Sequence, residues 1–147
     1  MHHIAQLNIA RMRAPLDDPL MQRFVEWLDP VNGFADESEG FVWRLQTEDG
    51  NATSIRTFED DSILVNMSVW RSIEELQAFV LHPNHTRVMR ESTRWFEPLD
   101  RPHLVLWWVR VGHIPTPDEA RKKLESLAAH GPTAEAFTFS QPFPPPK

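Results

Sequence analysis

The spacing of apolar residues predicts a strand and then a helix at the start of the chain. Residues 3–10 mix apolar and polar side chains in the manner of a strand. Residues 20–31 instead repeat apolar side chains every three or four positions, which is typical of an amphipathic helix. The pair Asp18-Pro19 supplies a capping residue and a proline at the first helical position, and Asn32-Gly33 predicts where the helix closes.

Two strands and a broken helix are predicted for the middle of the chain. Residues 41–45 and 63–70 are short runs rich in β-branched and aromatic side chains, and the second run carries bulk on both of its faces. Ser72 opens a capping box, which predicts a helix that must stop before Pro83. Helical spacing then resumes over residues 84–97.

A buried strand and a capped helix follow. Residues 103–111 form the most apolar run, and their β-branched and aromatic content favours a strand. Thr116 opens a second capping box, and the helix that it begins is predicted to end at Gly131. Residues 136–140 predict a short edge strand, after which a proline-rich stretch excludes ladder pairing.

This element order predicts an α+β protein with ferredoxin-like βαββαβ topology, in which helices cover one face of an antiparallel sheet. We expect a single domain over residues 1–140 and an extended proline-rich tail over residues 141–147. The opposite face of the sheet also needs cover. A second copy of the chain would provide it in a homodimer, or the helix that begins after Thr116 would provide it within one chain.

Composition narrows the classes of partner. The chain has 15 Lys and Arg against 21 Asp and Glu, and the resulting net charge of −6 argues against a nucleic-acid partner. Zero Cys excludes disulfides. The first residues lack the pattern of an export signal, and no apolar run approaches the ~20 residues that span a bilayer. We therefore expect a cytoplasmic protein that has no membrane partner.

Several motifs resemble known families. Residues 69–79, followed by His82 and His85, resemble the Trp, capped helix and His segment of dimeric α/β-barrel proteins, which include antibiotic-biosynthesis monooxygenases. Five further motifs resemble the domain of unknown function DUF3291, and with them the likeness runs over nearly the whole chain. These motifs are Trp95-Phe96-Glu97-Pro98, Leu106-Trp107-Trp108-Val109, Gly112-His113-Ile114-Pro115-Thr116, Gly131-Pro132-Thr133 and Phe137-Thr138-Phe139.

The resemblance implies a fold more firmly than a function. It implies a ferredoxin-like dimeric barrel, in agreement with the element order. The DUF3291 family brings no established reaction. The wider superfamily includes cofactor-free oxidation of aromatic polyketides, haem degradation and haem-dependent reactions, and some of its members only bind small molecules. Function must therefore be argued from individual residues.

His85 is the candidate catalytic residue. Its imidazole, with an ordinary pKa of ~6.5, could remove a phenolic proton or bind haem iron. The structural alternative is that His82 closes one helix and His85 lies in the first turn of the next, on either side of the break at Pro83. No Asp, Glu or Cys at a recognised spacing completes a zinc or iron site around these histidines, so we expect no metal centre.

Polar residues within buried strands mark a candidate substrate site. Asn66 and Ser68 share one strand face with Trp70. In the βαββαβ order the first and third strands are neighbours, so Asn8 is expected beside them. A buried amide without a partner costs ~1–3 kcal/mol, so either a ligand or neighbouring protein groups must satisfy these side chains.

The remaining indoles could line the same site or belong to the core. Trp43 and Trp95, together with Trp70, offer flat surfaces for an aromatic ligand. Trp107 and Trp108 are adjacent in a strand, so their side chains point to opposite faces and cannot both line one pocket.

These residues favour a small-molecule-binding protein, with cofactor-independent monooxygenation of an aromatic or polyketide-like substrate as the expected chemistry. His85 would act as the base, and the asparagines would hold an oxyanion. No Gly-rich phosphate loop is present, so no nucleotide or flavin cofactor is expected. The alternatives are a haem protein that uses His85 or His82 as the iron ligand, and a carrier without catalysis.

Overall fold

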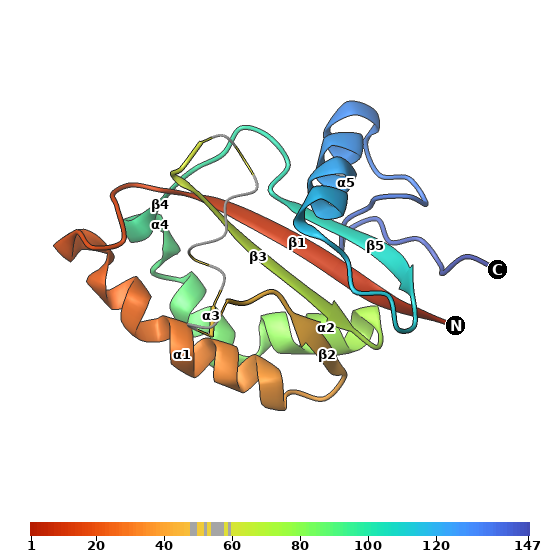
Figure 1. Ribbon diagram of the computed structural model, residues 1–147, viewed down its shortest axis with the longest axis horizontal. Coiled ribbons are helices and arrows are strands. Elements are labelled where there is room, and N and C mark those ends of the chain that lie inside the picture. The colour runs from red at the N-terminus through yellow and green to blue at the C-terminus, as the bar shows by residue number, and fades with distance from the viewer. Residues whose placement is uncertain (48–49, 52, 54–57, 59) are drawn as a thin grey trace.

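The computed structural model describes residues 1–47, 50–51, 53, 58 and 60–147. Strands and helices alternate along the chain much as the sequence predicts (Figure 1). The elements are β1 (His2–Met12), the short 3-10 helix η1 (Pro19–Met21), α1 (Gln22–Glu37), β2 (Phe41–Arg44), β3 (Ile63–Trp70), α2 (Ile73–Leu81), α3 (Pro83–Met89), α4 (Ser92–Trp95), β4 (Phe96–Glu97), β5 (Leu104–Arg110) and α5 (Pro117–His130).

The strands form one antiparallel sheet. β1 pairs with β3 on one side and with β5 on the other, and β2 pairs with the outer edge of β3. The two-residue strand β4 pairs with the end of β1, on the side that β5 occupies further along. The order β2-β3-β1-β5 is the ferredoxin-like order, so the predicted α+β fold and its central pair of first and third strands are confirmed.

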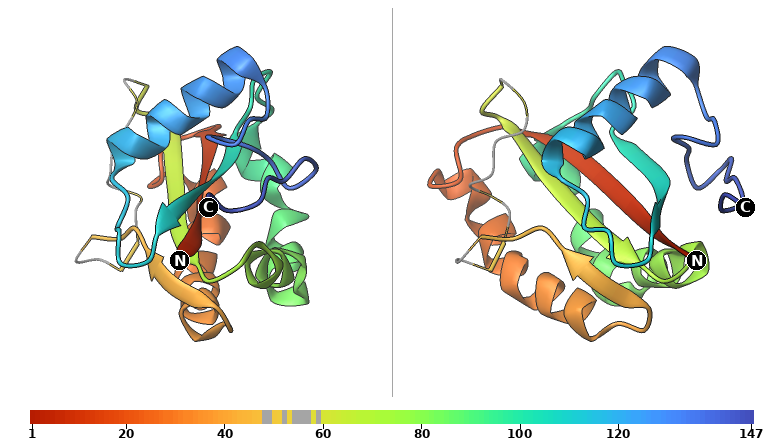
Figure 2. Two further views of the ribbon diagram at one scale, coloured as in Figure 1. Left: turned by 90° about the vertical axis from the view of Figure 1, so that its right-hand side faces the viewer. Right: turned by 45° about the vertical axis from the view of Figure 1, so that its right-hand side comes forward.

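Helices lie on both faces of this sheet. The helices that precede β5 lie on one face, whereas α5 crosses the other face (Figure 2). Beneath α5, apolar residues of β1 and β5 form a buried cluster with Leu124 and Leu127. Trp107 belongs to that cluster and donates a hydrogen bond from its indole nitrogen to Glu119 on α5. Trp108 points the opposite way, as the sequence predicts for adjacent strand residues.

The position of α5 corrects one expectation. Cover of the second sheet face by another copy of the chain is wrong for the area under α5, because Ala120, Leu124 and Leu127 bury that area within one chain. The alternative, in which the helix after Thr116 covers this face, is the arrangement observed. Formation of a homodimer itself stays a prediction.

Capping residues set the predicted helix starts. The Ser72 hydroxyl accepts a hydrogen bond from the Glu75 amide at 3.1 Å and donates one to its carboxylate at 3.0 Å. Thr116 likewise accepts from the Glu119 amide at 3.1 Å. α5 ends where Gly131 adopts a φ of +72°, a conformation that favours glycine. These local bonds explain why the sequence located both helices correctly.

Several element boundaries differ from the prediction. The predicted helical segment 84–97 is divided into α3 and α4, and its last two residues form β4. α1 does not close at Asn32-Gly33 but continues through Pro30 to Glu37. Its last turns are held by contacts distant in sequence, since the Phe34 ring lies 5.5 Å from the Phe79 ring. The predicted strand at 136–140 is reduced to isolated bridges, of which one joins Phe137 to β5.

No helix in the described part of the chain is both long and apolar enough to cross a bilayer.

Candidate functional site

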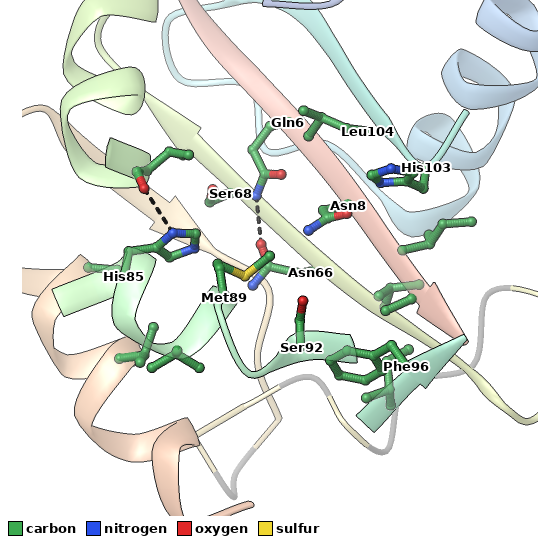
Figure 3. A pocket seen from close by; sticks show the side chains of 18 of the residues that line it. Gln6, Asn8, Asn66, Ser68, His85, Met89, Ser92, Phe96, His103 and Leu104 are labelled. Carbon is green, nitrogen blue, oxygen red and sulfur yellow. Dashed lines mark hydrogen bonds between the residues drawn. The ribbon is translucent and has the colours of Figure 1, made fainter. Parts of the chain in front are cut away.

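A cavity of about 580 Å³ lies between the sheet and the helices α1, α2 and α3. Its volume falls within the range of ~300–1,000 Å³ that is usual for small-molecule sites. Most of its wall is apolar, with aromatic residues such as Phe24, Trp27 and Phe79 contributed by the helices. The sheet forms the floor of the cavity and contributes the polar side chains of Gln6, Asn8, Asn66 and Ser68, whereas His85, Ser92 and His103 border the cavity from outside the strands (Figure 3).

Cross-strand pairing brings these polar side chains together. In the β1–β3 ladder Asn8 lies opposite Asn66, and Gln6 lies opposite Ser68. Side chains at alternate strand positions share a face, so all four belong to the floor of the cavity. The predicted proximity of Asn8, Asn66 and Ser68, on the same face as Trp70, is therefore confirmed.

Gln6 is the centre of a hydrogen-bonded row on this floor. Its Nε2 group donates to Asn66 Oδ1 at 2.8 Å and to Ser68 Oγ at 2.8 Å. The Ser68 hydroxyl also accepts from the indole nitrogen of Trp70 at 2.9 Å, and both residues are buried. This row fixes the orientation of Asn66 and of the Trp70 ring.

Several polar groups on the floor keep hydrogen-bonding capacity. Within the part of the chain that the structure describes, the Asn8 side chain forms no hydrogen bond with protein, and Asn66 uses its carbonyl oxygen but not its amide nitrogen. Figure 3 shows both side chains beside the cavity. A ligand carbonyl or hydroxyl could therefore accept a hydrogen bond from these amides.

His85 faces this floor from the helix side of the cavity (Figure 3). Its Nδ1 lies 3.0 Å from the backbone carbonyl oxygen of Val80. Because a carbonyl only accepts hydrogen bonds, Nδ1 carries the proton, and the neutral ring has a free electron pair on Nε2. Burial lowers the pKa of His85 below its ordinary value, although the hydrogen bond to Val80 opposes this shift. The ring is thus neutral near pH 7.

His82 has a structural role in this arrangement. Its Nδ1 accepts a hydrogen bond from the Asn84 amide at 3.1 Å and thereby caps α3. Its ring also packs against Phe34, with the centroids 4.5 Å apart. His82 does not line the cavity. Of the two histidines around Pro83, His85 is therefore the one placed to act on a ligand.

Trp43 and Trp95 do not line this cavity. A register shift in β2 places Phe41 opposite Trp70 but turns Trp43 to the α5 face of the sheet, opposite Val69. Trp95 is fully buried on α4 and packs against Phe24, with ring centroids 5.5 Å apart.

Many residues that line the cavity, His103 among them, were not predicted as site residues, and three of these bear on the argument. Gln6 has the clearest sequence signal, since it stands two positions before Asn8 and therefore on the same strand face. Trp27 and Phe139 also line the cavity, from α1 and from the segment after α5. Their participation depends on how these segments pack on the sheet, which spacing along the chain does not reveal.

The described residues include no group of three or more His, Cys, Asp or Glu side chains that could hold a metal ion. Haem is a separate case, because the free Nε2 of His85 is the donor type that haem iron uses. Two lining arginines could neutralise the propionates, but Arg44 is already paired with Asp36 at 2.7 Å. Arg13, whose Nε donates to the Thr93 carbonyl, would then have to neutralise both haem propionates. The described residues thus fit haem only in part.

Solved structures with the same fold come from several microorganisms. A protein of unknown function from Nitrosomonas europaea is 11% identical with a TM-score of 0.51, and the match covers 79% of this chain and 97% of that one. A conserved protein from Methanosarcina mazei Go1 is 12% identical with a TM-score of 0.51, and the match covers 75% and 93%. At these identities the likeness shows the fold alone.

Antibiotic biosynthesis monooxygenase-like proteins are also among the structural neighbours. One from Nitrosomonas europaea, described as a "putative antibiotic biosynthesis monooxygenase", is 14% identical over 77% of this chain and 90% of that one. Its TM-score of 0.46 is too low to bear on function. No curated protein matches the chain. The profile of the domain of unknown function DUF3291 matches residues 3–147, and the chain therefore belongs to the DUF3291 family.

Proposed function

We propose that this protein binds a small aromatic molecule in the cavity and that His85 removes a proton from a hydroxyl group of that molecule. One observation carries the proposal: the free Nε2 of a neutral His85 and the amide nitrogens of Asn8 and Asn66, which donate to no protein group among the described residues, border the same largely apolar cavity. Contrary to the sequence prediction, the two asparagines are not fully buried, since Asn8 is half-buried and Asn66 is exposed, and their amides are therefore accessible to a ligand. Convergent polar groups in an apolar hollow are typical of ligand sites.

The lining defines the ligand class. Apolar and aromatic side chains from the helices suit a planar hydrocarbon skeleton. The floor offers the uncharged amide and hydroxyl groups of Gln6, Asn8, Asn66 and Ser68, so the part of the ligand that lies on it should carry hydroxyl or carbonyl oxygens. Arg13, Arg44 and Glu97 also line the cavity, and Arg44 is already paired with Asp36. A polycyclic phenol or a hydroxylated anthrone meets both requirements.

The proposed chemistry is cofactor-independent oxygenation, which is one of several activities in the wider dimeric α/β-barrel superfamily that the sequence resembles. Nε2 of His85 accepts the hydroxyl proton, and the amides of Asn8 and Asn66 hold the resulting oxyanion. For an anthrone the hydroxyl that loses its proton is that of the enol tautomer, because the charge of this anion is delocalised onto the former methylene carbon on the opposite side of the central ring, and that carbon reacts with dioxygen. Two C–H bonds are replaced by a C=O bond, so one oxygen atom enters the product, and the other leaves with both hydrogens as water.

Isothermal titration calorimetry with 1,8-dihydroxyanthrone under nitrogen tests the binding step. We expect saturable binding to the wild-type protein. Asn66→Ala should weaken it about threefold to tenfold, the usual loss for one neutral hydrogen bond of ~0.5–1.5 kcal/mol. Trp43→Phe is the matched control, because Trp43 lies outside the cavity, and its affinity should be unchanged. Absence of saturable heat with the wild type contradicts the proposal.

Oxygen uptake with the same compound tests the proton transfer. Wild-type protein should consume dioxygen and form the anthraquinone, and His85→Ala should lose most of this activity. His82→Asn serves as the control, since asparagine can still cap α3 and His82 does not line the cavity. A Soret band on addition of hemin that disappears in His85→Ala would instead support the haem alternative. If the protein binds the compound but consumes no dioxygen, the result supports a ligand carrier without catalytic activity.

A further inference from the structure

The segment that follows α5 forms one wall of the cavity. Figure 2 shows this segment beside the outer edge of β5, on the side of the sheet that faces away from α5. Phe139, in the middle of the segment, lines the cavity together with Leu76 and Phe79 of α2 and Leu104 of β5. The segment pairs with the outer edge of β5 through Phe137 and Leu106, and its Phe139 belongs to the same apolar cluster as Leu76 and Phe79 of α2.

The segment is fixed to the sheet on both sides of Phe139. Before it, Phe137 is fully buried and exchanges two backbone hydrogen bonds with Leu106, of 2.8 and 2.9 Å. After it, the Phe143 carbonyl accepts a hydrogen bond of 2.9 Å from the indole nitrogen of Trp108. The rings of Phe137 and Phe143 pack together with centroids 5.8 Å apart.

Phe139 thus lies on a short turn between two anchors. The turn is closed by a 3.3 Å hydrogen bond from the Gln141 amide to the Thr138 carbonyl. The hydroxyl groups of Thr138 and Ser140 are also within 3.0 Å of each other. These contacts hold the Phe139 ring in place without tying it to the sheet ladder.

The contribution of Phe139 to the cavity differs from that of the floor. A phenyl ring offers a ligand no hydrogen bond, so this wall can discriminate by size and shape only. Leu76 and Phe79, which line the cavity and share an apolar cluster with Phe139, are also unable to form side-chain hydrogen bonds. If a ligand carries an alkyl substituent that points toward Phe139, each added methylene should raise the affinity of the ligand until the substituent reaches the Phe139 ring. One more methylene would then clash with the ring and lower the affinity.

We propose that Phe139 determines the longest apolar substituent that the cavity accepts, an inference that rests on the proposed function of the same cavity. The ring acts as the end wall, whereas the polar groups of the floor bind the oxygenated end of the ligand. Enlarging or shortening the side chain at this position should move the length limit in opposite directions.

A series of n-alkyl 4-hydroxybenzoates, from methyl to octyl, measures this limit by titration calorimetry. With wild-type protein the affinity should rise with chain length and then fall by on the order of tenfold or more at the first ester that is too long. Phe139→Ala should move that fall to a longer ester, and Phe139→Trp should move it to a shorter one. Two opposite shifts cannot arise from a general loss of stability.

Phe143→Leu is the control, because Phe143 does not line the cavity and leucine keeps the backbone carbonyl that accepts from Trp108. Its length limit should match that of the wild type. The same limit in Phe139→Ala, Phe139→Trp and wild type would overturn the inference while leaving ligand binding intact. If no ester binds to any of these proteins, the proposed function fails and the inference fails with it.

Discussion

Removing the Ser68 hydroxyl should destabilise the fold because two buried donors depend on it. Ser68 is 8% exposed and accepts hydrogen bonds from Gln6 and from Trp70, which are 6% and 1% exposed. In Ser68→Ala, Gln6 keeps Asn66 as an acceptor, whereas the Trp70 indole N–H loses the one acceptor found for it among the described residues. A stranded buried donor costs ~1–3 kcal/mol.

Urea unfolding followed by far-ultraviolet circular dichroism measures this cost. Ser68→Ala should lower the free energy of unfolding by about 1–3 kcal/mol, and each kcal/mol should lower Tm by about 2–4 °C for a domain of this size. In a Trp70→Phe background the donor is absent, so the cost of Ser68→Ala should shrink by at least ~0.5 kcal/mol.

Asn8→Ala is the control for that measurement. The Asn8 side chain forms no hydrogen bond with protein within the described chain, so its loss should change the free energy of unfolding by less than ~0.5 kcal/mol. If Asn8→Ala lowered the free energy of unfolding more than Ser68→Ala, the conclusion that Ser68 stabilises the fold whereas Asn8 is available to a ligand would be refuted. An unchanged Ser68→Ala cost in the Trp70→Phe background would refute the assigned hydrogen bond.

Further predictions concern a titrating group, two glycines and a cap. Because burial lowers the pKa of His85 in the folded chain, its neutral form stabilises the fold above pH ~6.5, and this contribution is lost as the pH falls through the lowered pKa. His85→Gln should therefore lose less stability than the wild type between pH 7.5 and 5, and equal losses would count against the burial effect. Gly40→Ala should lower Tm, since a Cβ there would lie 2.5 Å from Glu75 atoms at a φ of +86°. Gly33→Ala, in open space within α1, should instead raise stability by ~0.5–1 kcal/mol; melting curves that rank these two variants the other way would contradict the geometry. Thr116→Ala should cost ~0.5–2 kcal/mol in urea unfolding through loss of the α5 cap, and a neutral result would show that the cap contributes nothing.

Local chemistry explains which parts of the fold were predictable. Ser72 and Thr116 locate the starts of α2 and α5 because their caps bond to residues three positions away. The amphipathic pattern of α5 predicts that it packs against something but not which sheet face it covers. The end of α1 was missed for a related reason, since Phe34 is held by Phe79 from a distant part of the chain.

The candidate site also contains some residues whose positions the sequence predicts and others whose positions it does not. The two-residue strand period and the βαββαβ order were enough to place Asn8 beside Asn66, on the face that carries Trp70. Trp43 lies on the opposite face because of the register shift between Phe41 and Trp43, since one extra residue turns a side chain to the other face. A bulge of this kind has no clear signal in the sequence.

A crystal structure of the protein with 1,8-dihydroxyanthrone bound under nitrogen tests the central claim most directly. The ligand should lie between the sheet and the helices, with a hydroxyl oxygen within hydrogen-bonding distance of His85 Nε2 and another oxygen close to the amide of Asn66 or Asn8. Crystals in which protein side chains fill this space, or in which the compound binds only at the outer surface, would contradict the claim.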